Sequence, residues 1–229
     1  MATNQASGEA EPQAVRDGVF FTMPESLPRG RHNLPPDQVS NAQRERLLVA
    51  VTELLADRGY RGFGAGDVAS RAGVSLAAFY AQFENKDACV FAGYDRFIQV
   101  LLQRMVAVEL PKSDRAGLVR ALIAAYLETL QEDLVVARAY QVEIDALGPE
   151  ARARRRDSLT LFANHVRARA GELEPDGQPP EELPWSAYIG IVYAARQIAS
   201  DALDTEPEPD LTALEADFAT WMLDLFRQR

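Results

Sequence analysis

The stretch VASRAGVSLAAFYAQFENKDA, from Val68 to Ala88, decides the fold of this chain. It predicts a short helix over Asp67 to Ala72, followed by Gly73, which lets the backbone turn sharply through a left-handed conformation. The serine at position 75 is a favourable N-cap for a second short helix, Ser75 to Phe83. Two short helices joined by a turn that contains glycine are typical of a helix-turn-helix motif.

The second of these helices carries small side chains, Ala77 and Ala78, where a packed helix usually carries bulk. Small side chains let a helix approach a grooved partner closely, while Phe79 and Phe83 can anchor it inward. The next helix begins near Lys86, whose charge and neighbouring free N–H groups can meet a phosphate. Spacing alone also fits a plain pair of packed helices, because this geometry occurs in proteins that never touch DNA.

The remainder of the chain also follows a helical period, and no stretch shows convincing two-residue alternation. A first helix begins at the proline pair at 35–36 and is stopped by Gly59. The sequence therefore predicts an all-α fold of about nine helices. The later helices are expected over residues 86–109, 115–132, 134–147, 150–170, 185–203 and 211–226.

Composition bounds the class of protein. The chain has 229 residues, 47% of them hydrophobic, which is ample for a core. A single cysteine, Cys89, excludes an intramolecular disulfide framework, and with two histidines it leaves little for a zinc site, so we expect no metal and no cofactor. The first residues are polar without an apolar signal segment, and no apolar run reaches the roughly 18 residues that cross a bilayer. We expect a cytoplasmic protein with no membrane partner.

The net charge of −10 at first argues against a nucleic-acid partner. The distribution of charge argues otherwise, because Arg29 to Val90 holds eight basic and seven acidic residues, a balance of +1. The remainder holds 16 basic and 27 acidic residues, a balance of −11. The acidity therefore lies outside the segment that carries the helix-turn-helix motif. The run RARRR, Arg152 to Arg156, is interpreted as a solvated helix face paired with neighbouring acids.

Two longer stretches, QRERLLVAVTELLADRGY and DVASRAGVSLAAFYAQFENKDA, resemble the N-terminal domain of the tetracycline-repressor (TetR) family of transcriptional regulators. The resemblance runs from about Arg44 to Phe97, and beyond it only the helical plan and the length agree. It implies a homodimer that binds a double-stranded DNA operator, with a second domain that holds a small-molecule effector. The implied organisation is a flexible N-terminal arm over 1–34, a helix-turn-helix DNA-binding domain over 35–85, and a helical effector-binding and dimerisation domain over 86–229.

The resemblance also implies roles for residues of the motif. Val74 and Ser75 would open the recognition helix, and Tyr80 and Lys86 would contact phosphates. The residues that would face base edges are Leu76, Ala77 and Ala78.

The chain departs from the family at Phe63, Gly64 and Ala65, where a Thr-Thr-Val run is common. The threonine that would reach a phosphate is therefore absent. Because the recognition helix also lacks side chains suited to bidentate base contacts, direct readout would rest on thymine methyl groups and on Gln82, with DNA shape adding specificity.

Two arginines, Arg29 and Arg31, stand just before the first helix in the stretch LPRGRHNLPP. A flexible arginine pair beside a helix-turn-helix domain suits insertion into a narrow minor groove. An ordinary solvated tail is the alternative interpretation.

The C-terminal helices carry two apolar stripes that predict a four-helix dimer interface, with an intramolecular core as the alternative. Dimerisation would set two recognition helices about 34–36 Å apart, one turn of DNA. The interface residues that we expect are Ile189, Val192, Leu214, Phe218, Trp221, Met222 and Leu225.

Large side chains of the middle helices, several with polar tips, predict a pocket for a mostly apolar effector. Glu143 and Asp145 could instead favour a cation, although two acids on a helix are usually solvated. The predicted pocket residues are Tyr126, Tyr140, Phe162, His165, Tyr188 and Tyr193.

These features together predict a ligand-responsive DNA-binding transcriptional regulator, a repressor that its effector releases from the operator. Activation is an open alternative. A helical-bundle enzyme or an interaction protein that does not bind DNA are the rivals, but we find no convergent catalytic groups, no Gly-x-Ser-x-Gly elbow and no His-Glu-x-x-His helix. We expect no enzymatic activity.

Overall fold

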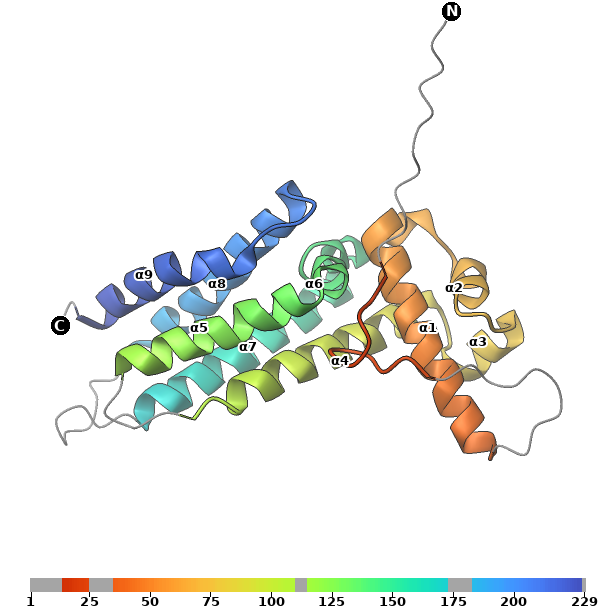
Figure 1. Ribbon diagram of the computed structural model, residues 1–229, viewed down its shortest axis with the longest axis horizontal. Coiled ribbons are helices and arrows are strands. Elements are labelled where there is room, and N and C mark those ends of the chain that lie inside the picture. Colours follow the sequence, from red (N-terminus) through yellow and green to blue (C-terminus); the bar gives the residue numbers. More distant parts are fainter. Residues whose placement is uncertain (1–13, 25–34, 110–114, 173–182, 228–229) are drawn as a thin grey trace, which may run out of the picture.

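The structure, a computed structural model, describes residues 14–24, 35–109, 115–172 and 183–227 (Figure 1). Within these ranges the regular structure is helical, apart from one isolated bridge between Asp17 and Phe21, so the all-α prediction is confirmed. None of the described helices combines the length and the apolar character that crossing a membrane requires. The α-helices are α1 (Pro36–Arg58), α2 (Ala65–Arg71), α3 (Leu76–Gln82), α4 (Lys86–Val106), α5 (Arg115–Glu132), α6 (Leu134–Gln141), α7 (Pro149–Gly171), α8 (Trp185–Thr205) and α9 (Glu215–Arg227).

The helix-turn-helix motif forms as the sequence predicts. Gly73 adopts φ +66°, and the N–H of Val74 closes the turn by donating to the carbonyl of Ala69 at 3.0 Å. Ser75 caps α3, because its Oγ accepts the N–H of Ala78 at 3.1 Å. Both α2 and α3 pack on α1, whose C-terminal half is buried. The short helices are therefore held by the core of the N-terminal part.

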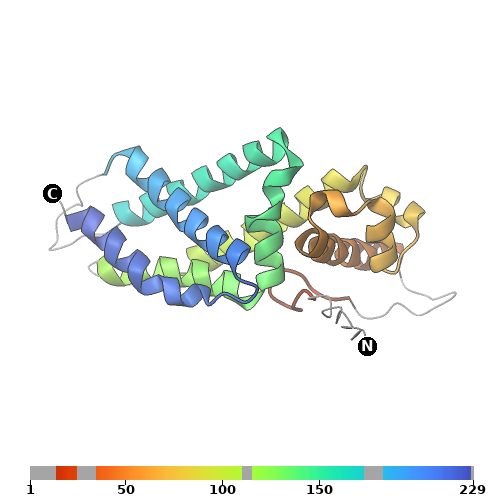
Figure 2. The same ribbon diagram turned by 90° about the horizontal axis from the view of Figure 1, so that it is seen from above.

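The helix α4 links the N-terminal part to a bundle made by the later helices (Figure 2). Its first turns pack on α1, and its remaining turns run along α5 and α7. The C-terminal helix α9 lies along α5, and α8 lies along α7. One helix thus contacts both α1, on which the motif packs, and the bundle.

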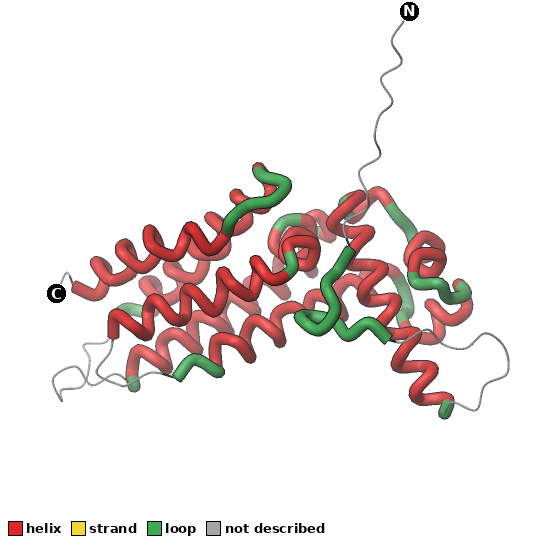
Figure 3. Tube along the Cα trace, in the orientation of Figure 1, coloured by secondary structure: helices red, strands yellow, loops and turns green. Residues whose placement is uncertain are grey.

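Residues 14–24 form a non-helical segment that lies against α1 and α4 (Figure 3). Phe20 and Phe21 are 2% and 1% exposed, and the ring of Phe20 stacks at 5.4 Å from that of Phe97. Two buried carboxylates accept its backbone N–H groups: Glu53 of α1 accepts from Val15 at 3.1 Å, and Asp133 accepts from Arg16 at 2.7 Å. The prediction of a flexible arm over 1–34 is therefore wrong for residues 14–24, because apolar burial and satisfied N–H groups fix this segment.

One predicted helix, 134–147, is broken in the structure. It ends at Gln141 and is followed by the 3₁₀ turn η2 (Glu143–Leu147). The carbonyl of Gln141 accepts hydrogen bonds from two side chains of α8: Arg196 Nη2 donates to it at 2.6 Å and Ser200 Oγ at 3.3 Å. The helix ends where a tertiary partner replaces the intrahelical hydrogen bond.

Candidate DNA-binding surface and ligand pocket

One face of α3 is open to solvent, as a recognition helix requires. Leu76 and Tyr80 are 47% and 56% exposed, and Ala77 is exposed between them. The opposite face is anchored by Phe79 and Phe83, which are 0% and 5% exposed. Large apolar side chains that stay exposed on a short helix mark a contact surface.

Lys86, at the start of α4, contacts the turn before α2 instead of projecting into solvent. Its Nζ donates to the carbonyls of Tyr60 at 2.7 Å and Phe63 at 3.0 Å, and lies 3.8 Å above the ring of Tyr60. Burial lowers the pKa of this ammonium below its ordinary value. An ammonium has three donors, so at most one remains for a phosphate after these two bonds. Lys86 therefore holds the turn before α2 against the start of α4, a structural role that the sequence did not reveal.

Tyr60 stabilises the same contact between the turn before α2 and the start of α4. The hydroxyl of Tyr60 donates to Asp87 Oδ1 at 2.5 Å. Burial, together with this hydrogen bond and the charge of Asp87, raises the pKa of Tyr60 to about 12. The phenol therefore stays protonated, and η1 (Tyr60–Gly62) is fixed against the start of α4.

The other predicted DNA-contacting residues are placed differently. The amide of Gln82 points to α1, because its Nε2 donates to Ser40 Oγ at 2.7 Å and to the Ser40 carbonyl at 3.3 Å. Ala78 is partly buried. The predicted minor-groove pair, Arg29 and Arg31, lies outside the described residues. Of the predicted DNA-contacting residues, the ones that are exposed on or next to α3 are therefore Ser75, Leu76, Ala77 and Tyr80.

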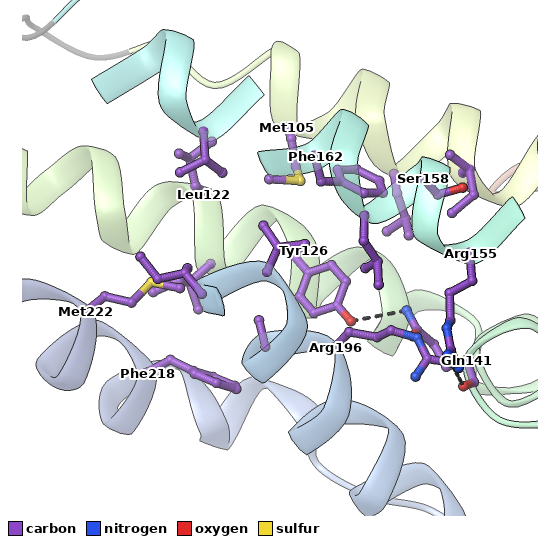
Figure 4. A pocket seen from close by; sticks show the side chains of 18 of the residues that line it. Met105, Leu122, Tyr126, Gln141, Arg155, Ser158, Phe162, Arg196, Phe218 and Met222 are labelled. Carbon is purple, nitrogen blue, oxygen red and sulfur yellow. Dashed lines mark hydrogen bonds between the residues drawn. The ribbon is translucent and has the colours of Figure 1, made fainter. Parts of the chain in front are cut away.

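A pocket lies inside the bundle between α4, α5, α7, α8 and α9 (Figure 4). The empty space between its walls amounts to about 1060 Å³, the open part included. Its walls are mostly apolar, as expected of a small-molecule site. Residues of this wall are Phe97, Leu101, Met105, Leu118, Leu122, Ile123, Leu159, Val166, Ile191, Phe218 and Met222.

The sequence identified part of this pocket. Tyr126, Tyr140 and Phe162 line it, whereas His165, Tyr188 and Tyr193 are not among its lining residues. Tyr188 is buried in a separate cluster with Ala163 and Ala170, and Tyr193 is 40% exposed on the bundle surface. His165 is partly buried, and burial lowers the pKa of its imidazole. Periodicity marked these aromatic residues, but it could not say which face of each helix the pocket occupies.

Polar groups gather at one end of the pocket, next to α6 (Figure 4). Arg155 and Arg196 are the charged residues among those that line it. Both contact one carboxylate oxygen of Asp145: Arg155 Nη1 forms a close ion pair with Oδ2, and Arg196 Nη2 lies 3.6 Å from it. Asp145 is therefore neutralised by arginine, and the alternative of a cation held by this residue is not supported.

Sequence reasoning missed these arginines. It took the RARRR run as a solvated face, which fits Arg154, paired with Glu150 and Asp95 on the surface. Arg155, the next residue, turns inward. The side chain of Arg196 is 11% exposed, and burial lowers the pKa of its guanidinium. A single basic residue in the mostly apolar period of α8 was the one available signal.

A hydrogen bond joins the pocket wall directly to the DNA-binding part. The hydroxyl of Tyr140, in α6, lies 2.8 Å from Thr52 Oγ1 in α1. Thr52 Oγ1 already donates to the carbonyl of Leu48 at 2.7 Å, so Tyr140 is the donor in this pair. Both side chains are fully buried. The pocket and the helix that carries the motif are therefore in physical contact.

The predicted dimer stripe largely faces the interior of its own bundle. Phe218 and Met222 are 4% and 8% exposed and line the pocket, as does Val192. These residues were predicted as interface, and the structure corrects this because α9 uses its apolar face to cover α5. Leu214 packs on the main core and Ile189 on the cluster around Tyr188, while the side chain of Leu225 lies outside the described atoms.

Large apolar side chains do remain exposed on α8 and α9. Tyr193 is 40%, Ile198 45% and Trp221 43% exposed. Of the predicted interface residues, Trp221 belongs to this surface.

Comparisons with known proteins agree with this architecture. The family model described as bacterial regulatory proteins, tetR family, matches residues 47–92. The chain is 27% identical over 214 residues to the HTH-type transcriptional regulator EthR of Mycobacterium tuberculosis, covering 88% of this chain and 94% of that protein. It is 30% identical over 105 residues to the HTH-type transcriptional activator FasR of Mycolicibacterium smegmatis, covering 46% of each chain.

Solved structures share the fold. The fatty acid degradation regulator FadR of Bacillus halodurans matches with a TM-score of 0.68 at 20% identity, over 86% of this chain and 100% of that chain. The transcriptional regulator FadR of Bacillus subtilis, solved in complex with stearoyl-CoA, matches with a TM-score of 0.63 at 19% identity, over 77% and 96%. At these identities the likeness concerns the fold alone.

A helix-turn-helix unit with an open recognition helix, joined to a bundle that encloses an apolar pocket, defines the class of ligand-responsive transcription regulators. The family match places its helix-turn-helix model on residues 47–92, where the structure shows that unit. Residues 47–92 match the TetR family, and the chain is a ligand-responsive DNA-binding transcriptional regulator and not an enzyme.

Proposed function

We propose that the chain is a repressor that binds its operator through the exposed face of α3. The observation that carries this proposal is the exposure of Leu76, Ala77 and Tyr80 on a short helix that Phe79 and Phe83 anchor from behind. Slim side chains admit the helix backbone to the major groove, and the methyl groups of alanine and leucine suit contact with thymine. Tyr80 and the remaining N–H of Lys86 are suited to phosphates.

The proposed organisation keeps the boundaries that the sequence indicates, with DNA binding by residues 35–85 and effector binding and dimerisation by 86–229. The exposed surface of α8 and α9 supports a homodimer, in which a second copy of the chain packs on this surface. Tyr193, Ile198 and Trp221 supply the apolar area of this surface. A two-fold axis through it would present two recognition helices to successive turns of DNA, about 34–36 Å apart. We place this regulator in the cytoplasm, away from membranes.

The effector is a small, mostly apolar molecule that occupies the bundle pocket. The lining residues support this, and so does the fold neighbour from Bacillus subtilis that was solved with stearoyl-CoA. Full release of DNA requires the effector to favour the released state by up to about 5 kcal/mol. The hydrogen bond between Tyr140 and Thr52 is a direct route from the pocket wall to α1. Effector binding that shifts Tyr140 would therefore move the helix on which α2 and α3 rest.

Duplex binding measured at several salt concentrations tests the DNA-binding part. With DNA from the flank of the chain's own gene, we expect the logarithm of affinity to fall linearly with the logarithm of salt concentration, because phosphate contacts release counterions. Ala77→Glu should abolish binding by placing a negative charge on the exposed face of α3. The control Ala168→Glu adds the same charge on the exposed side of α7 and should bind as the parent does.

Full affinity of Ala77→Glu would refute the placement of α3 in the groove. Absence of duplex binding at low salt would favour an interaction protein over a regulator. A ligand that strengthens transcription in a reporter assay, instead of relieving repression, would show activation.

A further inference from the structure

The polar end of the pocket contains a charge arrangement that an apolar effector would not need. Arg155 of α7 and Arg196 of α8 line it, while Asp145, the acid that pairs with both, is not a lining residue. Two guanidinium groups share one carboxylate, so this end carries a net charge of +1. The pocket therefore presents cationic donors to its interior and keeps the acid behind them.

Two hydrogen-bonding atoms at this end lack a partner in the described structure. Arg155 Nε and Asp145 Oδ1 are buried without a hydrogen bond. A buried guanidinium N–H left unpaired is unfavourable, and a bound acceptor would remove this penalty. The hydroxyls of Tyr94 and Ser158 also lie at this end, but their protons are already used: Tyr94 donates to Ser158 Oγ at 3.2 Å, and Ser158 donates to the Arg154 carbonyl at 2.9 Å.

The rest of the pocket is long, apolar and parallel to two helices. Along α4 its lining runs from Tyr94 to Met105, a rise of about 16 Å, and along α7 from Arg155 to Ala170, a rise of about 22 Å at about 1.5 Å per residue. The polar residues stand at the starts of these runs, and Met105 and Ala170 stand at their ends. An extended alkyl chain advances about 1.3 Å per carbon, given C–C bonds of about 1.5 Å. These lengths correspond to chains of about 12 to 17 carbons.

We infer that the effector is a long-chain carboxylic acid whose carboxylate binds Arg155 and Arg196 and whose alkyl chain lies along α4 and α7 toward Met105. The inference rests on the proposed function, since it names the ligand of the same pocket. A carboxylate accepts charge-assisted hydrogen bonds from two guanidinium groups, and arginine is the residue that suits such planar acceptors. Burial of the head group strengthens these bonds, because water does not screen them.

The head group would compete with Asp145 for the two arginines. Asp145 belongs to η2, which packs on η1 in the DNA-binding part. On the same turn, Glu143 lies so near Gly59 that a Cβ on this glycine would be 3.1 Å from Glu143 Oε2. A ligand that draws the arginines away from Asp145 thus acts on a turn that contacts η1 and Gly59 in the DNA-binding part.

Calorimetric binding to the full chain tests the inference with three probes of equal chain length: tetradecanoic acid, its methyl ester and tetradecylamine. We expect the acid to bind about tenfold or more tightly than the ester, because the ester cannot form the charge-assisted bonds. The amine should bind more weakly still, since its charge repels the arginines. Arg155→Met and Arg196→Met should remove the preference for the acid.

The matched control is Arg154→Met, the adjacent position on α7, whose side chain pairs with acids on the surface. This variant should keep the preference of the parent. Circular dichroism of each variant checks its fold, and the comparison of acid with ester in the parent needs no variant.

Equal or tighter binding of the ester, or of tetradecanoyl-coenzyme A, would overturn the carboxylate assignment. If such a neutral or thioester ligand still releases operator DNA in a gel shift, the proposed function stands while this inference fails. If no probe binds although the duplex does, the inference fails together with the apolar effector, and DNA binding stands.

Discussion

The buried pair of Thr52 and Tyr140 predicts unequal effects of two conservative substitutions. In Thr52→Val the phenol proton of Tyr140 loses its acceptor at 2.8 Å, and Tyr140 has no other hydrogen-bond partner in the described structure. In Tyr140→Phe the hydroxyl of Thr52 keeps its bond of 2.7 Å to the Leu48 carbonyl. The first change strands a buried donor, whereas the second removes a donor and leaves the acceptor partly satisfied.

The magnitudes follow from this asymmetry. A stranded buried polar group costs about 1–3 kcal/mol, whereas the net loss of one hydrogen bond costs about 0.5–1.5 kcal/mol. We expect Thr52→Val to lower the free energy of unfolding more than Tyr140→Phe does. The double variant should lie close to Tyr140→Phe alone, because removing the phenol removes the stranded donor that Thr52→Val creates.

Urea unfolding followed by circular dichroism, at one protein concentration because a dimer's stability depends on it, provides the measurement. A double-mutant cycle then gives the interaction energy of the pair. Additive effects, or a larger loss in Tyr140→Phe than in Thr52→Val, would refute the assignment of donor and acceptor. Retention of ligand-induced operator release in the double variant would show that the pair is not the route from the pocket to α1.

Three further perturbations have expected outcomes. In Gly93→Ala the new Cβ would lie 1.9 Å from the Tyr140 hydroxyl oxygen, so we expect the free energy of unfolding to fall by about 1–3 kcal/mol from overpacking. The control Gly66→Ala has open space at its Cβ and should unfold at no lower urea concentration than the parent. Burial raises the pKa of the Cys89 thiol to about 12, so a thiol reagent at pH 8 should label the protein only in denaturant, and labelling of the native chain would contradict its burial. Burial lowers the pKa of His165 in the folded chain. As the pH falls below about 6.5, the unfolded chain therefore takes up a proton at His165 more readily than the folded chain does, and the free energy of unfolding decreases. In His165→Asn the free energy of unfolding should fall less between pH 7 and pH 5 than it does in the parent. An equal fall in both proteins would show that His165 does not cause the loss of stability at low pH.

Local sequence signals were sufficient for the DNA-binding motif. Gly73 and Ser75 set the turn and the cap through their own backbone and side-chain chemistry, and the structure shows both. The alternation of exposed Tyr80 with buried Phe79 follows from the helical period alone. Contacts within about four residues decide these features, so the sequence can be read for them directly.

The pocket and the N-terminal segment depended on contacts between distant residues. Periodicity marks Phe218 as apolar, but whether it covers its own bundle or a second copy is decided by the packing of α9 on α5. Arg154 and Arg155 are neighbours of the same residue type. Only the rotation of α7 about its axis points Arg155 into the pocket and leaves Arg154 on the surface. The segment at 14–24 lacks a period of its own, and it is fixed because Glu53 and Asp133, far along the chain, accept its N–H groups.

The sequence by itself determined the all-α class and the helix-turn-helix motif, because caps, turns and the helical period are local. The tertiary structure alone decided which side chains form the pocket, where its charge lies and how it touches the motif. Those properties depend on how whole helices are rotated and packed against one another. Burial energy summed over many contacts sets that arrangement, and no short stretch of residues records it.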